Sequence, residues 1–196
     1  LHSFPTRRSS DLVVGRGETA WHNALPACEY RHGQMIGRFP DRPAGAEHFS
    51  FPAQGFSLRD VPGLADFDVL NLHWVAGMCD PALEPEAFAG RPLVWTLHDM
   101  NPFTGGCHYA DGCRGFEKHC GSCPQLGSRD ENDISRQTWK SRMTAYRKLD
   151  LHIVAPSVWL AEEARKSSLF SRFPVHVIPY AQPLSVYQLP DRKSVV

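Results

Sequence analysis

The stretch LVWTLHD at residues 93–99 decides the fold class, because a short apolar run ends there in two polar side chains. Runs of the same kind lie on either side of it in the chain: FDVLNL at 67–72, LHIVA at 151–155 and PVHVIP at 174–179. Each run is apolar without strict alternation, and helix-like segments separate the runs. This order of strands and helices predicts an α/β, Rossmann-like domain, in which a parallel sheet carries helices on both faces.

The segments between the runs contain helix start signals. Asn132 or Asp133 can cap one helix, and Ser157 can cap another. A shorter helix is expected at residues 85–90, where Gly90 can close it. The sequence therefore predicts a helix between each pair of consecutive strands.

The chain has 196 residues, with 21 Lys and Arg against 21 Asp and Glu, so its formal net charge is zero. The 42% share of hydrophobic residues is ordinary for a globular protein and argues against disorder. A balanced charge also argues against nucleic-acid binding, which favours a basic excess. No apolar run approaches the ~20 residues of a membrane helix, and no signal-peptide pattern opens the chain. We therefore expect a cytoplasmic protein of one or two domains.

The two ends of the chain differ in character from the rest. Residues 1–12 read LHSFPTRRSSDL and the chain ends in DRKSVV, and both stretches resemble translated sequencing-adaptor sequence. Ordinary frayed termini are the alternative. We expect one incomplete domain at residues 13–188, between foreign segments at 1–12 and 189–196. Within it, the segment from Gly15 to Gly17 lacks the third glycine of a phosphate loop, which favours a turn.

Polar side chains follow the first three apolar runs. His73 and Trp74 come after the first run, His98 and Asp99 after the second, and Ser157 opens a helix after the third. Ligands of open parallel sheets bind beyond the carboxyl ends of the strands, so we expect these groups to meet at one edge. Imidazole and carboxylate can exchange protons with a hydroxyl group near neutral pH, and a helix N-terminus attracts anions. Each residue alone has a structural alternative, a packed histidine or a plain cap, but their convergence favours a functional role.

Residues 100–131 form a long connection that is rich in glycine and cysteine. A connection of this length without regular structure is uncommon in a compact domain, so we expect a cross-link or a bound metal ion to hold it in place. Its cysteines, Cys107, Cys113, Cys120 and Cys123, have the spacing C-x5-C-x6-C-x2-C. Four thiolates around a tetrahedral structural zinc would close the connection into a rigid knuckle, which is the interpretation we favour. Reduced cysteines in a packed loop and disulfides are the alternatives. A catalytic zinc is not expected, because four cysteines leave no open position.

Five stretches carry a family resemblance when they are read together: DVLNLHW (68–74), VWTLHDMNPFTGGCHYADGC (94–113), CGSCPQL (120–126), VAPSVWLAEEARKSSLF (154–170) and VHVIPYAQPLSVY (175–187). They resemble bacterial group 1 glycosyltransferases, of the branch that builds capsular polysaccharides and exopolysaccharides, including the colanic-acid type. The stretch around TLHDMNPFTGGCHY is the most specific part of this resemblance.

The resemblance implies a GT-B fold, in which two Rossmann-like domains face a cleft. Such hexosyltransferase-type enzymes transfer a sugar from a nucleotide-sugar donor to a glycan or lipid-linked acceptor, and some touch the inner membrane peripherally. The N-terminal domain holds the acceptor, and the C-terminal domain binds the nucleotide sugar. This chain resembles the N-terminal domain alone, so sugar transfer by the fragment itself is not expected.

The resemblance also assigns roles to particular residues. His98 and Asp99 match the HD pair of the family on the acceptor side, and are expected to hold or polarise the acceptor hydroxyl. The expected cleft-lining positions are His73, Thr104, Gly105, Gly106, Lys140 and Ser157. A carboxylate oxygen of Asp99 is expected to bind the His98 imidazole and fix its tautomer.

Two other classes of function stay open at this point. The cysteine-rich connection could make the chain a zinc-knuckle interaction module without catalytic activity. A hydrolase built on the His98 and Asp99 pair is the third hypothesis, but the chain lacks a nucleophile motif such as G-x-S-x-G.

Overall fold

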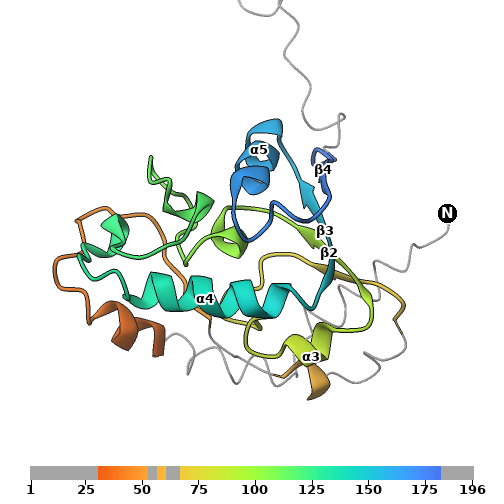
Figure 1. The fold of residues 1–196 in the computed structure, drawn as a ribbon, viewed down its shortest axis with the longest axis horizontal. Helices are drawn as coiled ribbons and strands as arrows, with labels where there is room; N and C mark the ends of the chain where they lie inside the picture. Colours follow the sequence, from red (N-terminus) through yellow and green to blue (C-terminus); the bar gives the residue numbers. More distant parts are fainter. Residues whose placement is uncertain (1–30, 53–56, 61–66, 182–196) are drawn as a thin grey trace, which may run out of the picture.

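The computed structural model describes residues 31–52, 57–60 and 67–181, and it forms a parallel sheet with helices packed against it (Figure 1). Several sequence predictions lie outside these ranges: the foreign ends at 1–12 and 189–196, and the turn from Gly15 to Gly17. They stay predictions.

The sheet contains the four strands that the sequence predicts, all of them parallel and in the order β1-β2-β3-β4. The strands are β1 (Leu70–Leu72), β2 (Pro92–Thr96), β3 (Asp150–Ala155) and β4 (Val175–Val177). Pairing of Leu93 with both Leu70 and Leu151 fixes the register across β1, β2 and β3. The prediction of a parallel α/β fold is therefore confirmed.

One helix follows each of the first three strands. They are α3 (Pro85–Phe88), α4 (Ile134–Tyr146) and α5 (Val158–Lys166), and residues 31–36 are also helical. Asp133 caps α4, because its carboxylate accepts hydrogen bonds from the Ser135 and Arg136 backbone N–H groups. Ser157 caps α5 by accepting from the Leu160 N–H. Both predicted caps are confirmed, with Asp133 rather than Asn132 before α4.

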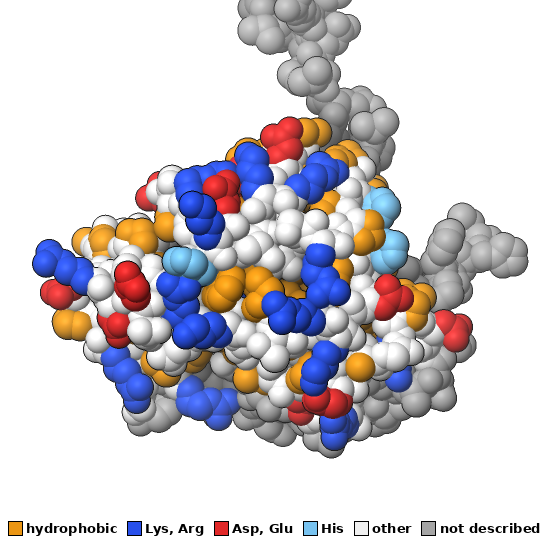
Figure 2. Space-filling view, in the orientation of Figure 1, with side chains coloured by type: hydrophobic (Ala, Val, Ile, Leu, Met, Phe, Trp, Pro, Cys, Tyr) orange, Lys and Arg blue, Asp and Glu red, His pale blue; other side chains and the backbone are white. Residues whose placement is uncertain are grey.

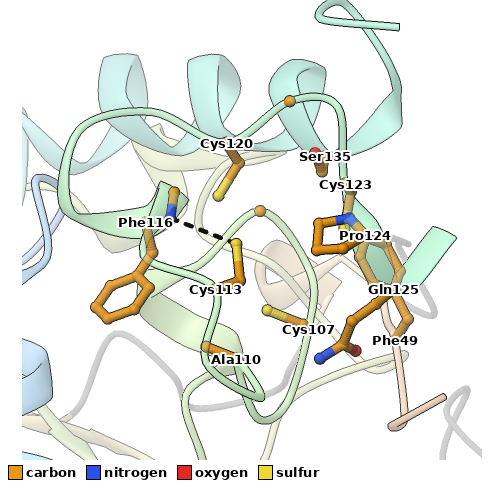
Figure 3. Close-up of a pocket in the computed structure, with 13 residues that line it drawn as sticks. Phe49, Cys107, Ala110, Cys113, Phe116, Cys120, Cys123, Pro124, Gln125 and Ser135 are labelled. Carbon is orange, nitrogen blue, oxygen red and sulfur yellow. Dashed lines mark hydrogen bonds between the residues drawn. The ribbon is translucent and has the colours of Figure 1, made fainter. Parts of the chain in front are cut away.

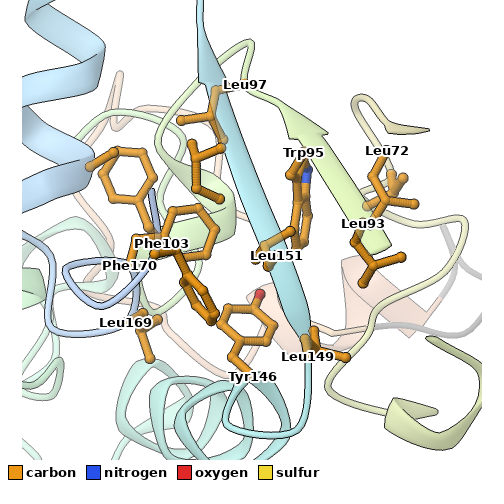
Figure 4. Close-up of a cluster of buried hydrophobic side chains, with 14 of the residues drawn as sticks. Leu72, Leu93, Trp95, Leu97, Phe103, Tyr146, Leu149, Leu151, Leu169 and Phe170 are labelled. Atoms are coloured by element: carbon orange, nitrogen blue, oxygen red, sulfur yellow. The ribbon is translucent and has the colours of Figure 1, made fainter. Parts of the chain in front are cut away.

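The core lies between the sheet and the described helices (Figure 4). Trp95 of β2 contacts Tyr146 of α4 with ring centroids 6.0 Å apart, and it lies equally far from Phe170 after α5. Leu151 and Ile153 of β3 are buried on the same face. Burying each of these side chains contributes about 1.5–3 kcal/mol to stability.

Buried and more exposed residues alternate along the strands more strictly than the apolar runs of the sequence suggest. In β3, Leu151, Ile153 and Ala155 are buried while His152 is exposed and Val154 is half-buried. The described α3, α4 and α5 contribute Phe88, Tyr146 and Leu160 to one shared core. Helices on the second face of the sheet stay a prediction, because the described segments place none there.

The connection from β2 to α4 is more structured than the sequence suggests. It contains three short 3-10 turns, at Asn101–Phe103, Gly115–Glu117 and Pro124–Leu126. Each turn buries one large apolar side chain: Phe103, Phe116 and Leu126. The connection is therefore packed onto the domain and places its side chains in fixed positions.

Charged groups of both signs are interspersed over the face in Figure 2, with apolar side chains between them. Within the described ranges, no helix has the length and apolar character needed to cross a membrane.

Candidate functional site

The carboxyl ends of the strands bring polar side chains together, as the sequence predicts. His73 and Trp74 follow β1, His98 and Asp99 follow the β2 region, and Tyr180 follows β4. Hydrogen bonds link His73 to His98, Trp74 to Asp99, and His98 to Tyr180. This edge of the sheet therefore carries two hydrogen-bonded networks, one exposed and one buried.

The exposed part is a chain of three side chains, Tyr180, His98 and His73. The Tyr180 hydroxyl lies 2.6 Å from His98 Nδ1, and His98 Nε2 lies 3.0 Å from His73 Nδ1. A neutral imidazole has one N–H donor and one acceptor nitrogen, so protons can be arranged along this chain in either direction. Both ring nitrogens of His98 already have partners. His73 Nε2 is then the nitrogen best placed to exchange a proton with a bound molecule.

The pKa values of this exposed chain are shifted from their ordinary values. Partial burial of its ring, and then the nearby His98, lower the pKa of His73. Partial burial also raises the pKa of Tyr180, and Tyr109 and Asp99 add to the shift. His73 is therefore held neutral near neutral pH, the form that accepts a proton.

The buried part centres on Asp99, and it corrects one prediction. Asp99 does not bind His98. Its carboxylate lies 2.6 Å from His108 Nδ1, accepts from Trp74 Nε1 at 2.9 Å, and accepts from the Asn101 N–H at 2.9 Å. Consecutive side chains leaving an extended strand point to opposite sides, so His98 is exposed while Asp99 is buried.

The buried network continues into a distant part of the chain. His108 Nε2 lies 3.0 Å from the Ser50 hydroxyl, which lies 3.2 Å from His48 Nε2. Two backbone hydrogen bonds, Ser50 N–H to Gly106 and His108 N–H to His48, hold these segments side by side. His48, Ser50, His108 and Tyr180 are functional candidates that sequence reasoning missed. His108 directly follows Cys107 in the sequence. It could have been found if this histidine had been considered as a candidate in its own right, apart from the cysteines.

The network keeps Asp99 ionised. Burial alone would raise the pKa of Asp99, but hydrogen bonds from His108, Asn101 and Trp74 outweigh burial and lower it below 3.8. Hydrogen bonds connect Ser50 to His108 and His108 to Asp99, the same order as in the Ser-His-Asp triad of serine hydrolases. Ser50 is only 8% exposed and also contacts His48, so its hydroxyl is not presented to an external carbonyl. The geometry therefore favours a positioning network over a hydrolase.

Three residues that were expected to line a cleft are buried instead. The Thr104 hydroxyl donates to the carbonyl of Cys107 at 2.8 Å and accepts from the Gly106 N–H. A Cβ on Gly105 would lie 2.5 Å from the Ser135 carbonyl, and one on Gly106 would lie 2.5 Å from the Phe49 ring. The three residues form a tight turn that packs into the domain, so their role is structural.

Lys140 and Ser157 do not join the network either. Lys140 lies within α4 with an exposed side chain, and no hydrogen bond or ion pair of the described chain links it to His98 or Asp99. The Ser157 hydroxyl serves as the cap of α5, while the residue itself is exposed at the same edge of the sheet. Ser157 is thus near the candidate site but engaged by its own helix.

A surface cavity of about 390 Å³ lies beside this edge. Its aromatic wall is formed by Tyr109 and Trp159, whose rings stack with centroids 6.2 Å apart and are 44% and 51% exposed. Asp111, Arg114 and Glu163 supply polar and charged groups around it. Exposed aromatic faces beside polar groups are typical of ligand-binding pockets.

The four clustered cysteines all line one small cavity of about 20 Å³ in the β2–α4 connection (Figure 3). They are free thiols, so the disulfide alternative is not realised. Burial raises the pKa of Cys120 to about 12 and that of Cys123 to about 11. Among the described residues, no group of three or more His, Cys, Asp or Glu side chains is arranged to hold a metal ion.

Comparison with known proteins finds one informative likeness. Over 80 residues the chain is 34% identical to the provisionally named colanic acid biosynthesis glycosyl transferase WcaC of Escherichia coli (strain K12). The match covers 38% of this chain and 19% of that protein. The chain thus spans about a fifth of this relative. No protein-family model and no solved structure matches the chain.

Proposed function

We propose that this chain is part of a glycosyltransferase that acts in polysaccharide biosynthesis. The complete enzyme transfers a sugar from a nucleotide-sugar donor to a hydroxyl of a glycan or a lipid-linked acceptor. The observation that carries the proposal is the hydrogen-bonded chain of Tyr180, His98 and His73 at the carboxyl edge of a parallel sheet. The likeness to the Escherichia coli protein supports the same reaction class.

The chemistry of this proposal needs a group that orients the acceptor and takes up its proton. Transfer breaks the bond between the anomeric carbon and a phosphate oxygen, forms a bond to the acceptor oxygen, and releases the acceptor proton. His73 Nε2 or His98 accepts or relays that proton as the oxygen attacks. Asp99 is a positioning residue, which holds the side chains of Trp74 and His108 in place by hydrogen bonds.

The acceptor binds, in this proposal, in the cavity beside the imidazoles. The aliphatic C–H face of a sugar ring packs on the exposed faces of Tyr109 and Trp159, which are negative at their centres. Hydroxyl groups of the sugar meet the exposed Asp111 at the cavity wall. Met100, which follows Asp99, and Glu47, which precedes His48, also line this cavity, so the cavity adjoins the edge of the sheet that carries the imidazole chain.

The remaining parts of the reaction belong, in this proposal, to sequence outside these 196 residues. This chain is the acceptor-binding domain of a GT-B hexosyltransferase, and the donor-binding domain follows it in a longer protein. A cytoplasmic location with peripheral contact to the inner membrane fits a lipid-linked acceptor. The chain alone is then expected to release no nucleotide from nucleotide sugars.

The test uses the complete reading frame that contains this chain. Purified protein is incubated with a panel of nucleotide sugars and oligosaccharide acceptors, and nucleotide release is measured for wild type, His98→Ala and His73→Ala. We expect each variant to lose a factor of about 10² to 10⁴ in turnover, the range for positioned acid–base groups. Donor affinity and melting temperature should change little.

A matched control exists on the same sheet. His152 and His176 form another exposed imidazole pair, 3.4 Å apart, that is not at the carboxyl edge of β1 and β2. His152→Ala should therefore keep wild-type turnover. Equal turnover in well-folded His98→Ala and His152→Ala proteins would contradict the proposed role of the imidazole chain.

A further inference from the structure

The strongest unassigned feature is the set of four cysteines in the β2–α4 connection. Cys107, Cys113, Cys120 and Cys123 line the same cavity, whose volume of about 20 Å³ is that of one small ion or water (Figure 3). Four thiol side chains thus line one cavity, although they are spread over 17 residues of the sequence.

One of the four sulfur atoms accepts a hydrogen bond from the backbone. The Gly115 N–H donates to Cys113 Sγ at 3.4 Å, two residues along the chain. Hydrogen bonds of this kind stabilise sulfur that carries negative charge and orient it toward a cation.

The turn between the last two cysteines has an uncommon conformation that fits the same purpose. Gly121 has φ of +136° and Ser122 has φ of +45°, and a left-handed serine is rare. The space beside Cys120 is kept open by Gly105, because a Cβ there would lie 3.0 Å from the Cys120 sulfur. Both features let the sulfur atoms approach the cavity closely.

We infer that Cys107, Cys113, Cys120 and Cys123 bind one structural zinc ion through four thiolates. Tetrahedral S₄ sites select zinc or iron, and zinc needs no redox partner. Each cysteine releases its proton to solvent as its Zn–S bond forms. The four thiols line the cavity without closing on one point, so zinc binding must contract the cavity to Zn–S distances of about 2.3 Å.

The ion would act on the candidate site through the backbone. His108 is adjacent to Cys107, and its N–H bonds to the His48 carbonyl. A zinc ion at Cys107 therefore fixes the segment that presents His108 to Asp99. It leaves no open coordination position, so its role is structural.

Metal analysis of the 196-residue chain tests this inference directly. We expect about one zinc per chain after expression in zinc-supplemented medium and exhaustive dialysis. Cobalt substitution should give the intense visible bands of tetrahedral cobalt thiolate. Cys113→Ser and Cys120→Ser should lose most of the metal, and chelation of wild type should lower the melting temperature. None of these readouts depends on sugar transfer.

Cys79→Ala is the matched control, because Cys79 is also a free, buried cysteine but lies outside the cavity. It should keep one zinc per chain even where its melting temperature falls. A folded wild-type chain with four reactive thiols and no bound metal would overturn the inference. So would iron in place of zinc, or disulfide-linked peptides that join these cysteines.

Discussion

The buried carboxylate of Asp99 forms hydrogen bonds with three neighbouring groups. His108, Trp74 and the Asn101 N–H keep it ionised and hold its pKa below the ordinary 3.8, although burial opposes the shift. A carboxyl group with a lowered folded-state pKa contributes stability above its ordinary pKa. That contribution is lost as the pH falls through the folded-state pKa.

The first residue-scale prediction follows from this sign. The unfolding free energy of wild type should fall steeply as the pH drops below about 4, and Asp99→Asn should flatten that slope while lowering stability at pH 7. Urea unfolding of both proteins between pH 3 and pH 7 measures the difference. Parallel pH profiles would contradict the inferred ionisation of Asp99.

Trp159 gives a second residue-scale prediction, which depends on the proposed acceptor cavity. A ring-stacking contact is worth about 0.5–1.5 kcal/mol, so Trp159→Ala should raise the acceptor KM of the complete enzyme about 2- to 10-fold. Its ring is 51% exposed, so the melting temperature should hardly change. Val158→Ala, at a 61% exposed neighbour, should leave KM unaltered. An unchanged KM for Trp159→Ala would remove the ring from the acceptor site.

Sequence reasoning located the residues at the sheet edge but not their partners. His73, His98 and Asp99 could be placed because each follows an apolar run, and parallel strands end at one edge. The pairing of Asp99 with His108 could not be found, because it depends on side-chain directions and on a turn held by Ser50. Ser50 is far away in sequence and belongs to no motif.

At the scale of elements, the caps of α4 and α5 differ in how many groups they engage. The Asp133 carboxylate is buried and accepts from the N–H groups of Ser135, Arg136 and Cys123. The Ser157 hydroxyl is exposed and accepts from the Leu160 N–H alone. Asp133 therefore joins α4 to the cysteine-rich connection, whereas Ser157 serves only its own helix.

This difference predicts unequal costs for removing the two caps. Asp133→Ala should lower the unfolding free energy by about 2 kcal/mol, at the upper end for a cap, and Ser157→Ala by about 0.5–1 kcal/mol. Thermal unfolding of both variants, each compared with wild type, measures the order. Equal losses would show that the bond to Cys123 adds nothing.

The elements themselves were the most predictable part of the protein. Strong start signals at Asp133 and Ser157, and short apolar runs, sufficed to predict α4, α5 and all four strands. The 3-10 turns of the β2–α4 connection were missed, since they are too short for a periodic pattern. They form because Phe103, Phe116 and Leu126 find buried places in the domain.

At the scale of the whole molecule, Arg142 links three segments that lie outside the strands: α4, the segment after β1 and the turn after β2. Its guanidinium is fully enclosed and pairs with Asp80 at 3.0 Å. It also donates to the carbonyl oxygens of Asn101 and Thr104. One side chain of α4 thus ties the segment after β1 to the turn after β2.

Breaking this connection should be costly. Arg142→Ala leaves the Asp80 carboxylate buried without its cation, which typically costs about 3–5 kcal/mol. Lys148→Ala is the control, because its ion pair with Glu86 is exposed to solvent and contributes little to stability. Chemical unfolding should separate the two variants clearly. Similar losses would mean that solvent reaches Asp80 once Arg142 is removed.

The register of the sheet has a consequence for how the chain folds. β2 pairs with β1 across a short connection, whereas Pro92 of β2 must find Asp150 of β3 across the whole cysteine-rich segment and α4. Closing a longer loop costs more chain entropy before any contact forms, so docking of β3 should be the slow step in refolding. The buried Trp95 lies on β2 beside Tyr146, and its fluorescence should report that step in stopped-flow experiments. Cross-linking within the connection should accelerate it by shortening the effective loop.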